Sequence, residues 1–400
     1  MGGLFGQYQR WMGLNDADVA WLEAVGRAFA AAGGSGSVIL ADVALEAGLR
    51  AAGVSVTRAD IQVSSPILSG IDPATGYIED PVNSATGNFV LPETDVVFGG
   101  PSQGLAISRM YNSTLAAAYD EPEACGVLGP GWSTILDQRL IVTDEQARWV
   151  RDDGREIVFP LTGRNGASGS PTAEGCHTVE GPWRAAQDNV WISRGDAADL
   201  AGVQGATVAG PVWIVADNTG SRLIFTAEGA WVGSTSGAGD GVWIERHDGV
   251  ITSMHSEWGR SVDLFYAQGR LAKAVASDGR SVSYAYDSQG RLVEVTRPDG
   301  VHHYQWDGWL LSQVIDASGV AQCVNTFDAL GRIRTQRDAT GHLTRFTYLP
   351  GGVTVADDGQ GHHSNTWISD ARGRTVGIID ADGQRTSMRY DRYGNLVGAT

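Results

Sequence analysis

The C-terminal part of the sequence carries a repeat of about 21 residues that fixes the spacing of its aromatic and acidic side chains. Its aromatic-Asp pairs are separated by 20, 21 and 63 residues, and they are Tyr286-Asp287, Trp306-Asp307, Phe327-Asp328 and Tyr390-Asp391. The two intervening positions are half occupied, because Tyr348 keeps the aromatic residue and Asp370 keeps the acid. Such a period indicates an array in which each unit has the same fold and packs on its neighbours.

Each repeat predicts one β-hairpin. Ser281–Tyr286 alternates as a half-buried strand does, and Asp287–Gly290 offers the side-chain acceptor and the flexible glycine of a tight turn. Arg291–Thr296 returns as a second strand, and Arg297–Gly300 turns the chain again. Because a lone hairpin is marginally stable in water, we expect neighbouring hairpins to pair edge to edge in a continuous antiparallel sheet.

The repeat selects a set of residues whose expected role is structural, in strands and turns. Gly269-Arg270 lies 21 residues before Gly290-Arg291, so the array is predicted to begin near residue 246. The repeat residues are Tyr286, Asp287, Gly290, Arg291, Trp306, Asp307, Phe327, Asp328, Gly331, Arg332, Asp370, Gly373, Arg374, Tyr390, Asp391 and Gly394.

The chain before the array divides into three predicted parts. Apolar residues at helical spacing over 15–29 and 38–50 predict a short helical hairpin within residues 1–62. Residues 63–165, called the leading domain here, contain short β-type runs separated by Pro, Gly and Asp clusters. Residues 166–245 predict a β-rich connecting region, and 246–400 the repeats. The expected fold class is therefore mainly β.

Composition excludes several functions. The net charge of −17, with Lys273 as the only lysine, opposes binding to nucleic acid. Cys125, Cys176 and Cys323 are odd in number and far apart, so they form neither a disulfide framework nor a zinc-ligand pattern. No apolar run is long enough to span a membrane, and the start of the chain lacks a conventional signal peptide.

The tandem motif resembles the YD repeats of bacterial Rhs proteins, best in Tyr284–Leu292 and Tyr390–Leu396. The preceding region is similar to the domain that leads into such repeats. The stretches that carry this second likeness are Asp80–Phe89, Arg109–Ser113, Leu128–Trp132 and Asp152–Pro160. Together the resemblance covers residues 78 to 400.

The resemblance implies a β-sheet that spirals into part of a hollow shell, with a variable toxin domain held inside. Such proteins are carriers of polymorphic toxins used between competing bacteria, and they leave the cytoplasm by specialised secretion machines. The implied partners are a chaperone or secretion apparatus at the N-terminal helices, and a C-terminal toxin or further repeats encoded downstream. The resemblance implies no enzyme activity for this stretch and no cofactor. The sequence stops at Thr400 without the family's self-cleavage region or toxin, so we expect a truncated copy, a fragment or one gene of a split set.

Several residues suggest chemistry that their context disfavours. Gly100–Gly104 places Ser102 in a G-x-S-x-G pattern, but a strand follows where a nucleophile elbow needs a helix. The pairs His302-His303 and His362-His363 could suggest metal ligands, but adjacent strand residues point to opposite faces. The repeated Asp residues could suggest a glycosidase, yet their spacing places them in successive turns. A hydrolase centred on Ser102 is therefore the weakest alternative.

A second alternative is a cell-surface adhesin. The aromatic residues Tyr284, Trp306, Phe346, Tyr348 and Trp367 could form exposed rows that stack on glycans. Cross-strand packing is the commoner use of such residues in a sheet, and we expect it here.

Overall fold

The structure is a computed structural model, and it describes residues 70, 74–98, 105–118, 125–161, 181–185, 188–197, 208–237, 241–360, 364–391 and 394–400. These residues are mainly β, as expected. The predicted helical hairpin in residues 1–62, Ser102, the pair His362-His363 and Cys176 lie outside the described residues.

The leading domain consists of three small antiparallel sheets and two short helices. The sheets are β1-β2, β3-β4-β5 and β6-β7-β8. The strands are β1 (Tyr77–Ile78), β2 (Val82–Asn83), β3 (Val90–Val97), β4 (Ala106–Asn112), β5 (Trp132–Thr134), β6 (Arg139–Val142), β7 (Gln146–Val150) and β8 (Glu156–Pro160). The helices are α3 (Ser113–Ala117) and the 3-10 turn η3 (Ile135–Asp137).

All later strands belong to one large antiparallel sheet, in which each strand pairs with the next along the chain. The upstream strands are β9 (Trp183–Arg184), β10 (Val190–Asp196), β11 (Pro211–Asp217), β12 (Arg222–Thr226), β13 (Trp231–Thr235), β14 (Gly241–His247) and β15 (Val250–Ser256). The next are β16 (Ser261–Ala267), β17 (Arg270–Ala276), β18 (Ser281–Tyr286), β19 (Leu292–Arg297), β20 (Gly300–Asp307), β21 (Leu310–Ile315) and β22 (Ala321–Phe327). The last are β23 (Ile333–Asp338), β24 (Leu343–Leu349), β25 (Val353–Asp357), β26 (Ser364–Ser369), β27 (Thr375–Ile379), β28 (Arg385–Tyr390) and β29 (Leu396–Ala399).

The pairing begins upstream of the predicted start of the array. Residues 183–237, which the sequence assigns to a separate connecting region, already form the first strands of the same sheet. The sheet continues through residue 246, because β14 and β15 pair on both sides of a register shift at Glu245/Arg246. The 21-residue repeat is thus the more regular part of a longer run of hairpins.

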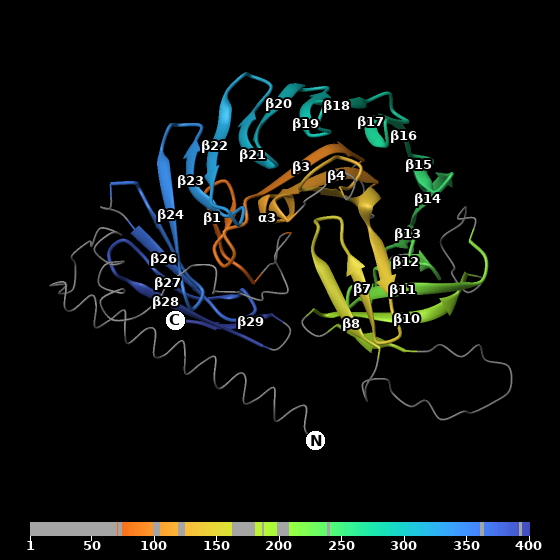
Figure 1. The fold of residues 1–400 in the computed structure, drawn as a ribbon. Coiled ribbons are helices and arrows are strands. Elements are labelled where there is room, and N and C mark those ends of the chain that lie inside the picture. Colours follow the sequence, from red (N-terminus) through yellow and green to blue (C-terminus); the bar gives the residue numbers. More distant parts are fainter. Residues whose placement is uncertain are drawn as a thin grey trace.

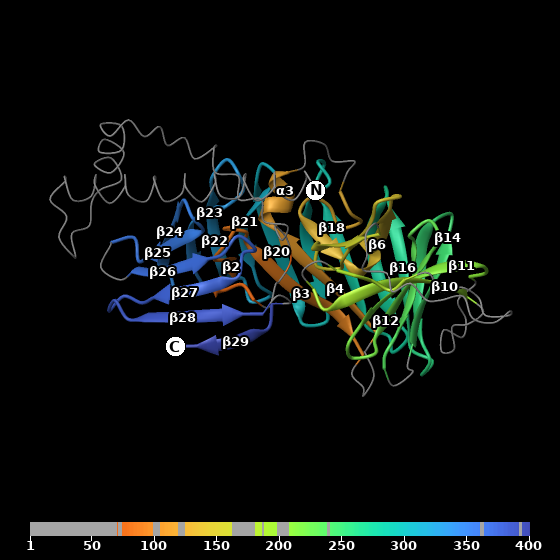
Figure 2. The same ribbon diagram turned by 90° about the horizontal axis from the view of Figure 1, so that it is seen from below.

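The sheet curves around the leading domain. Figure 1 shows β14 to β24 passing around β3, β4 and α3, with β7 and β8 near β10 and β11. The view in Figure 2, turned by 90°, shows the leading strands beside the wall that the sheet forms. The leading domain therefore occupies the concave side of the sheet.

Alternating burial explains this arrangement. In β18, Val282 and Tyr284 are buried while Ser283 and Ala285 are exposed, so one face of the strand is apolar and covered. The covered face belongs to a single core that also contains Phe89, Tyr111 and Trp132 of the leading domain. A one-layer sheet must bury its apolar face against a second layer, and here the leading domain supplies that layer.

Candidate functional site: the interface between the leading domain and the repeat sheet

The Tyr-Asp turns are built around the carboxylate, as the sequence predicts for most of them. Asp328 Oδ1 accepts hydrogen bonds from the backbone N–H groups of Leu330 and Arg332, at 2.9 and 3.0 Å. Its Oδ2 accepts from the Arg332 guanidinium, with Nε at 2.7 Å. Gly331 between them has a φ of 73°, the left-handed conformation that glycine adopts most readily. One carboxylate thus closes the turn and fixes the arginine.

The same arrangement recurs at Asp287 with Arg291 and at Asp370 with Arg374. The arginines then reach the next hairpin: Arg291 Nη1 donates to the Gly308 carbonyl and Arg374 Nη1 to the Asp391 carbonyl. At Asp391 the partner is Asn395, whose side-chain amide replaces the guanidinium. The repeated Arg therefore links one turn to its neighbour, a role that the spacing alone did not reveal.

Asp307 departs from the predicted turn. It is exposed at the end of β20 and pairs with Leu310 across a two-residue connection, Gly308-Trp309. The connection is three residues shorter than the five-residue connections 287–291 and 328–332, so the aspartate lies in the strand ladder. The aromatic-Asp pattern is the same here, and only the missing downstream Gly-Arg distinguishes this turn in the sequence.

A β-bulge lies at the aromatic position of most repeats. The strand register shifts at Ala285/Tyr286, Gln305/Trp306 and Thr326/Phe327, and the same shift recurs at Phe265/Tyr266, Ile368/Ser369 and Arg389/Tyr390. The extra residue of a bulge bends the strand and increases its local twist. Bulges repeated at this spacing curve the sheet, and most of them coincide with the repeated aromatic residue.

Aromatic side chains join successive repeats. The Tyr286 hydroxyl donates to the Leu271 carbonyl at 2.7 Å, and Trp306 Nε1 donates to the Leu292 carbonyl at 2.8 Å. The Tyr348 hydroxyl makes the same bond to Ile333, also at 2.7 Å. Each acceptor belongs to the preceding repeat, so these bonds tie the hairpins in series.

The aromatic residues do not form the exposed rows that the adhesin alternative needs. Tyr284, Phe346 and Tyr348 are buried, and Trp306 and Trp367 are partly buried against the same core. Their rings face the concave side, where the leading domain packs. The prediction of exposed aromatic rows is therefore wrong for these five residues, and the packing interpretation is confirmed.

Several hydrogen bonds join the leading domain to the sheet. We call five of them stations, and in each of these a backbone N–H is the donor. At four of them an N–H of the sheet donates: Leu271 to the Val127 carbonyl, Leu311 to the Tyr111 hydroxyl, Ile333 to the Gly87 carbonyl and Thr375 to the Ala74 carbonyl. At the fifth, Leu140 N–H of the leading domain donates to the Gly229 carbonyl. The donor–acceptor distances lie between 2.8 and 3.0 Å.

Two glycines show how close the layers come. A Cβ on Gly87 would lie 2.6 Å from the Tyr348 ring, and one on Gly331 would lie 2.5 Å from the Ala117 Cβ. Real Cβ contacts are essentially never that short. The stations therefore require glycine for space as well as for backbone conformation.

A buried charged cluster lies at the centre of the interface. Arg109 on β4 has a fully buried side chain, and its Nε donates to Asp95 Oδ2 at 2.8 Å. Its Nη2 donates to the Tyr304 hydroxyl of the sheet at 2.8 Å, while the Tyr284 hydroxyl donates to Asp95. Burial and the Asp95 carboxylate hold the pKa of Tyr284 well above its usual value, so the hydroxyl remains a donor.

The cluster balances its charges. Arg297 of the sheet pairs with Glu93 at 2.7 Å, so two arginines face two carboxylates. The Arg109 guanidinium also lies 4.5 Å from the centre of the Trp132 ring. A balanced buried cluster specifies which surfaces meet, because removing one charge would leave another buried without a partner. The sequence showed Arg109 only as part of a motif.

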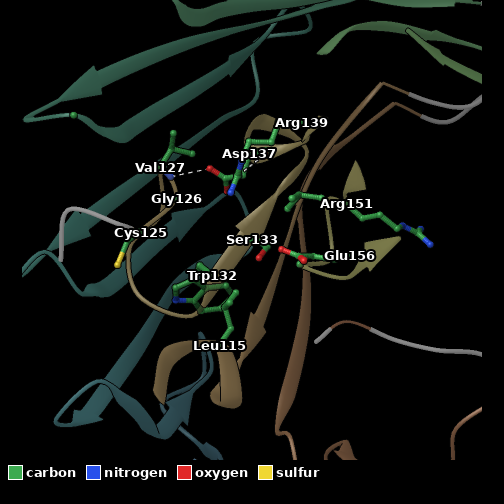
Figure 3. A pocket seen from close by; sticks show the side chains of 13 residues that line it. Leu115, Cys125, Gly126, Val127, Trp132, Ser133, Asp137, Arg139, Arg151 and Glu156 are labelled. Atoms are coloured by element: carbon green, nitrogen blue, oxygen red, sulfur yellow. Dashed lines mark hydrogen bonds between the residues drawn. The ribbon is translucent and has the colours of Figure 1, made fainter. Parts of the chain in front are cut away.

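A pocket of about 400 Å³ opens in the leading domain and borders the sheet at Gly269 (Figure 3). Cys125, Trp132, Asp137 and Glu156 are among the residues that line it. Burial raises the pKa of Asp137 to about 6, although its oxygens accept hydrogen bonds from the N–H groups of Val127 and Thr134. Burial also raises the pKa of Cys125, which makes its thiol a weak nucleophile at neutral pH. Through its hydrogen bonds to Val127 and Thr134, the Asp137 carboxyl group holds the 125–137 loop.

The histidine pair within the described residues is divided between the two faces. His302 is buried beside Arg297, with His302 Nε2 2.6 Å from Arg297 Nη2, whereas His303 is exposed. Over the ranges that the structure describes, no three His, Cys, Asp or Glu side chains gather into a group that could hold a metal ion. In the same ranges no helix has the length and apolarity needed to cross a membrane.

The family model described as RHS Repeat matches residues 265–302 and 370–400, which are hairpins of the sheet. The chain contains Rhs repeats. A second model, a domain of unknown function (DUF6531), matches residues 79–159, which form most of the leading domain.

The Rhs-repeat protein is similar to the tRNA nuclease WapA of Bacillus subtilis strain 168, at 25% identity over 323 residues. It is similar also to the tRNA(Glu)-specific nuclease WapA of B. subtilis subsp. natto strain BEST195, at 24% identity over 323 residues. In both cases the match covers 78% of this chain but only 13% of the relative.

Among solved structures, the Photorhabdus luminescens Tc holotoxin pore matches with 13% identity and a TM-score of 0.27, over 86% of this chain and 17% of that one. The N-terminal domain of the effector protein SpvB from Salmonella typhimurium strain LT2 matches with 12% identity and a TM-score of 0.25, over 78% of this chain and 97% of that domain.

Proposed function

We propose that this chain forms part of the wall of an Rhs-type shell that encloses and delivers a toxin between competing bacteria. The observation that carries the proposal is the continuous ladder from β9 to β29, curved around a domain packed on its concave face. A sheet of this shape separates an inner space from solvent. The repeat match supports the same role.

In this proposal the chain encloses and does not catalyse. The conspicuous polar residues of the interface, Asp328, Arg332 and Arg109, already hold one another or the backbone. The toxin, or further repeats, would be encoded beyond residue 400. The nuclease activity in the names of the WapA relatives belongs to proteins of which this chain matches 13%.

Export completes the proposal. The protein would be made in the cytoplasm and then leave by a specialised secretion machine to reach the cell surface or the medium. Residues 1–62 would bind the chaperone or the secretion apparatus. This assignment follows from the family resemblance and from the position of that segment ahead of the leading domain.

The test uses the complete gene product from its own host. We expect electron cryo-microscopy to show residues 183–399 as a wall around additional density that neither the sheet nor the leading domain accounts for. A strain lacking the gene should lose its advantage over a sibling without the locus, and the wild-type gene should restore it. An empty wall, together with unchanged competition on deletion, would contradict the proposal. Binding of the purified protein in a glycan array would instead favour the adhesin alternative.

A further inference from the structure

The five stations follow an order that neither the repeat nor the proposed function requires. Along the sheet they involve Gly229, Leu271, Leu311, Ile333 and Thr375. Their partners in the leading domain are Leu140, Val127, Tyr111, Gly87 and Ala74, in that order. The sheet positions ascend in the sequence while the leading-domain positions descend. At these five stations the two layers run past each other in opposite directions, and the stations are 42, 40, 22 and 42 residues apart along the sheet, so one occurs every one or two repeats. The contacts of β3 lie outside this order, because Asp95 and Glu93 meet Tyr284 and Arg297, between the stations at Leu271 and Leu311.

Four of the stations coincide with bulges. Leu271, Ile333 and Thr375 each lie opposite the residue at which the register shifts, namely Tyr266, Phe327 and Ser369. Leu311 has the same position opposite Trp306. A bulge disrupts the ladder locally, and a buried N–H that lacks a ladder partner must find another acceptor. At these four residues the acceptor comes from the leading domain.

The apolar face of the sheet also depends on the leading domain, which covers it. Leu271, Leu311 and Ile333 are fully buried, and they belong to one core with Phe89 and Tyr111. Without the leading domain, the hairpins would expose this face along with the amides of the bulges. The exposed apolar face and the unpaired amides would both destabilise the curved form of the sheet, because these amides lie at the bulges that bend it.

We infer that the leading domain is an intramolecular template, on which the repeat hairpins fold and from which the sheet takes its curvature. The leading domain precedes the hairpins in the chain, so it is synthesised first. Each later station at a bulge then finds its acceptor at a leading-domain residue nearer the N-terminus. The partner of these bulged amides is thus a specific surface of the same chain, running from Val127 back to Ala74.

The chain provides a matched pair of glycines for a test. Gly331 and Gly319 both end Asp-x-x-Gly turns, with φ of 73° and 82°, and each donates its N–H to the carbonyl of the turn aspartate at 3.0 Å. A Cβ on Gly331 would strike Ala117 of the leading domain. A Cβ on Gly319 meets no described atom within 4 Å. Alanine strains both turns alike but obstructs the template at one only.

The experiment is pulse-labelled hydrogen exchange during refolding of the full chain. In the wild type, we expect peptides from β4 and β5 to become protected before those from β22 to β25. Gly331→Ala should delay protection of β22 to β25 by about tenfold or more, whereas Gly319→Ala should leave that delay near the wild-type value. Simultaneous protection of both layers in the wild type, or equal delays in the two variants, would overturn the inference.

Tyr111→Phe provides a second test if Gly331→Ala does not refold. The substitution removes only the hydroxyl that accepts from Leu311 N–H and leaves the ring in place. We expect native-state exchange to become about tenfold faster through β20 to β23, beyond the single amide that loses its acceptor. Faster exchange confined to Leu311 would show a local contact and no template.

Discussion

At the scale of single residues, the repeated aspartate is a turn-forming group. Asp328, Asp287 and Asp370 each bind two backbone N–H groups and one guanidinium. Burial alone would raise the pKa of Asp287, but the hydrogen bonds from Arg291 and Gln289 lower it below its usual value. The carboxylate is thus held in its charged form, which is the form that the turn uses.

Replacing Asp328 by alanine should destabilise the protein by about 2 kcal/mol, because two backbone N–H groups and Arg332 lose their acceptor. Asp307→Ala is the control, since Asp307 is exposed in a two-residue connection, and it should change stability by less than about 0.5 kcal/mol. Urea denaturation measures both. Equal effects would show that the aromatic-Asp pattern, and not the turn geometry, determines the loss.

Asp137 should make stability depend on pH in the opposite sense to the turn aspartates. Its pKa in the folded protein is about 6, above the value of about 3.9 for an unfolded chain. The folded state therefore binds the proton more tightly, so the contribution of Asp137 to stability decreases as pH rises from about 4 to 6. As pH rises over this range, the melting temperature of the wild type should fall relative to that of Asp137→Asn. A difference independent of pH would contradict the assignment.

At the scale of the hairpin, an aromatic side chain joins each unit to the one before it. The donor can be a tyrosine hydroxyl or an indole N–H, as at Tyr286, Tyr348 and Trp306. Phe327 has no such donor, and the adjoining contact is different: the Leu311 amide binds the Tyr111 hydroxyl. The aromatic identity at each repeat therefore determines whether the carbonyl of the preceding repeat receives a side-chain hydrogen bond, while the amide of the same residue can bond to the leading domain in either case, as at Leu271 and Leu311.

Tyr348→Phe should cost about 1 kcal/mol, because the buried Ile333 carbonyl loses its hydrogen bond while the ring still packs. Tyr266→Phe is the matched control. Tyr266 has the same position in its repeat, but its hydroxyl makes no hydrogen bond with the described residues, so we expect less than about 0.5 kcal/mol. Thermal unfolding distinguishes them, and an equal loss in both variants would argue against bonds between repeats.

At the scale of the whole molecule, the periodicity of the sequence predicts the hairpins and their lateral pairing, and the ladder from β14 to β29 confirms it. Alternation in Ser281–Tyr286 also predicts which face is buried. The burial of that face under the leading domain could not be predicted, because Arg109, Gly87 and Tyr111 find their partners about 200 residues or more away. Contacts at such separation leave no local pattern.

The most direct test that the sheet curves around the leading domain is a disulfide between the N-terminal end of the leading domain and the C-terminal end of the sheet. A Cβ at Gly394 would lie 3.9 Å from the Ala74 Cβ, within the range that a disulfide spans. With Cys125, Cys176 and Cys323 replaced by alanine, Ala74→Cys with Gly394→Cys should cross-link under mild oxidation and migrate faster on a non-reducing gel. Ala74→Cys with Gly383→Cys is the control, since Gly383 also has a positive φ but has no described atom within 4 Å of its Cβ position. Cross-linking of the first pair alone is the predicted result, and equal or absent cross-linking in both would contradict the account.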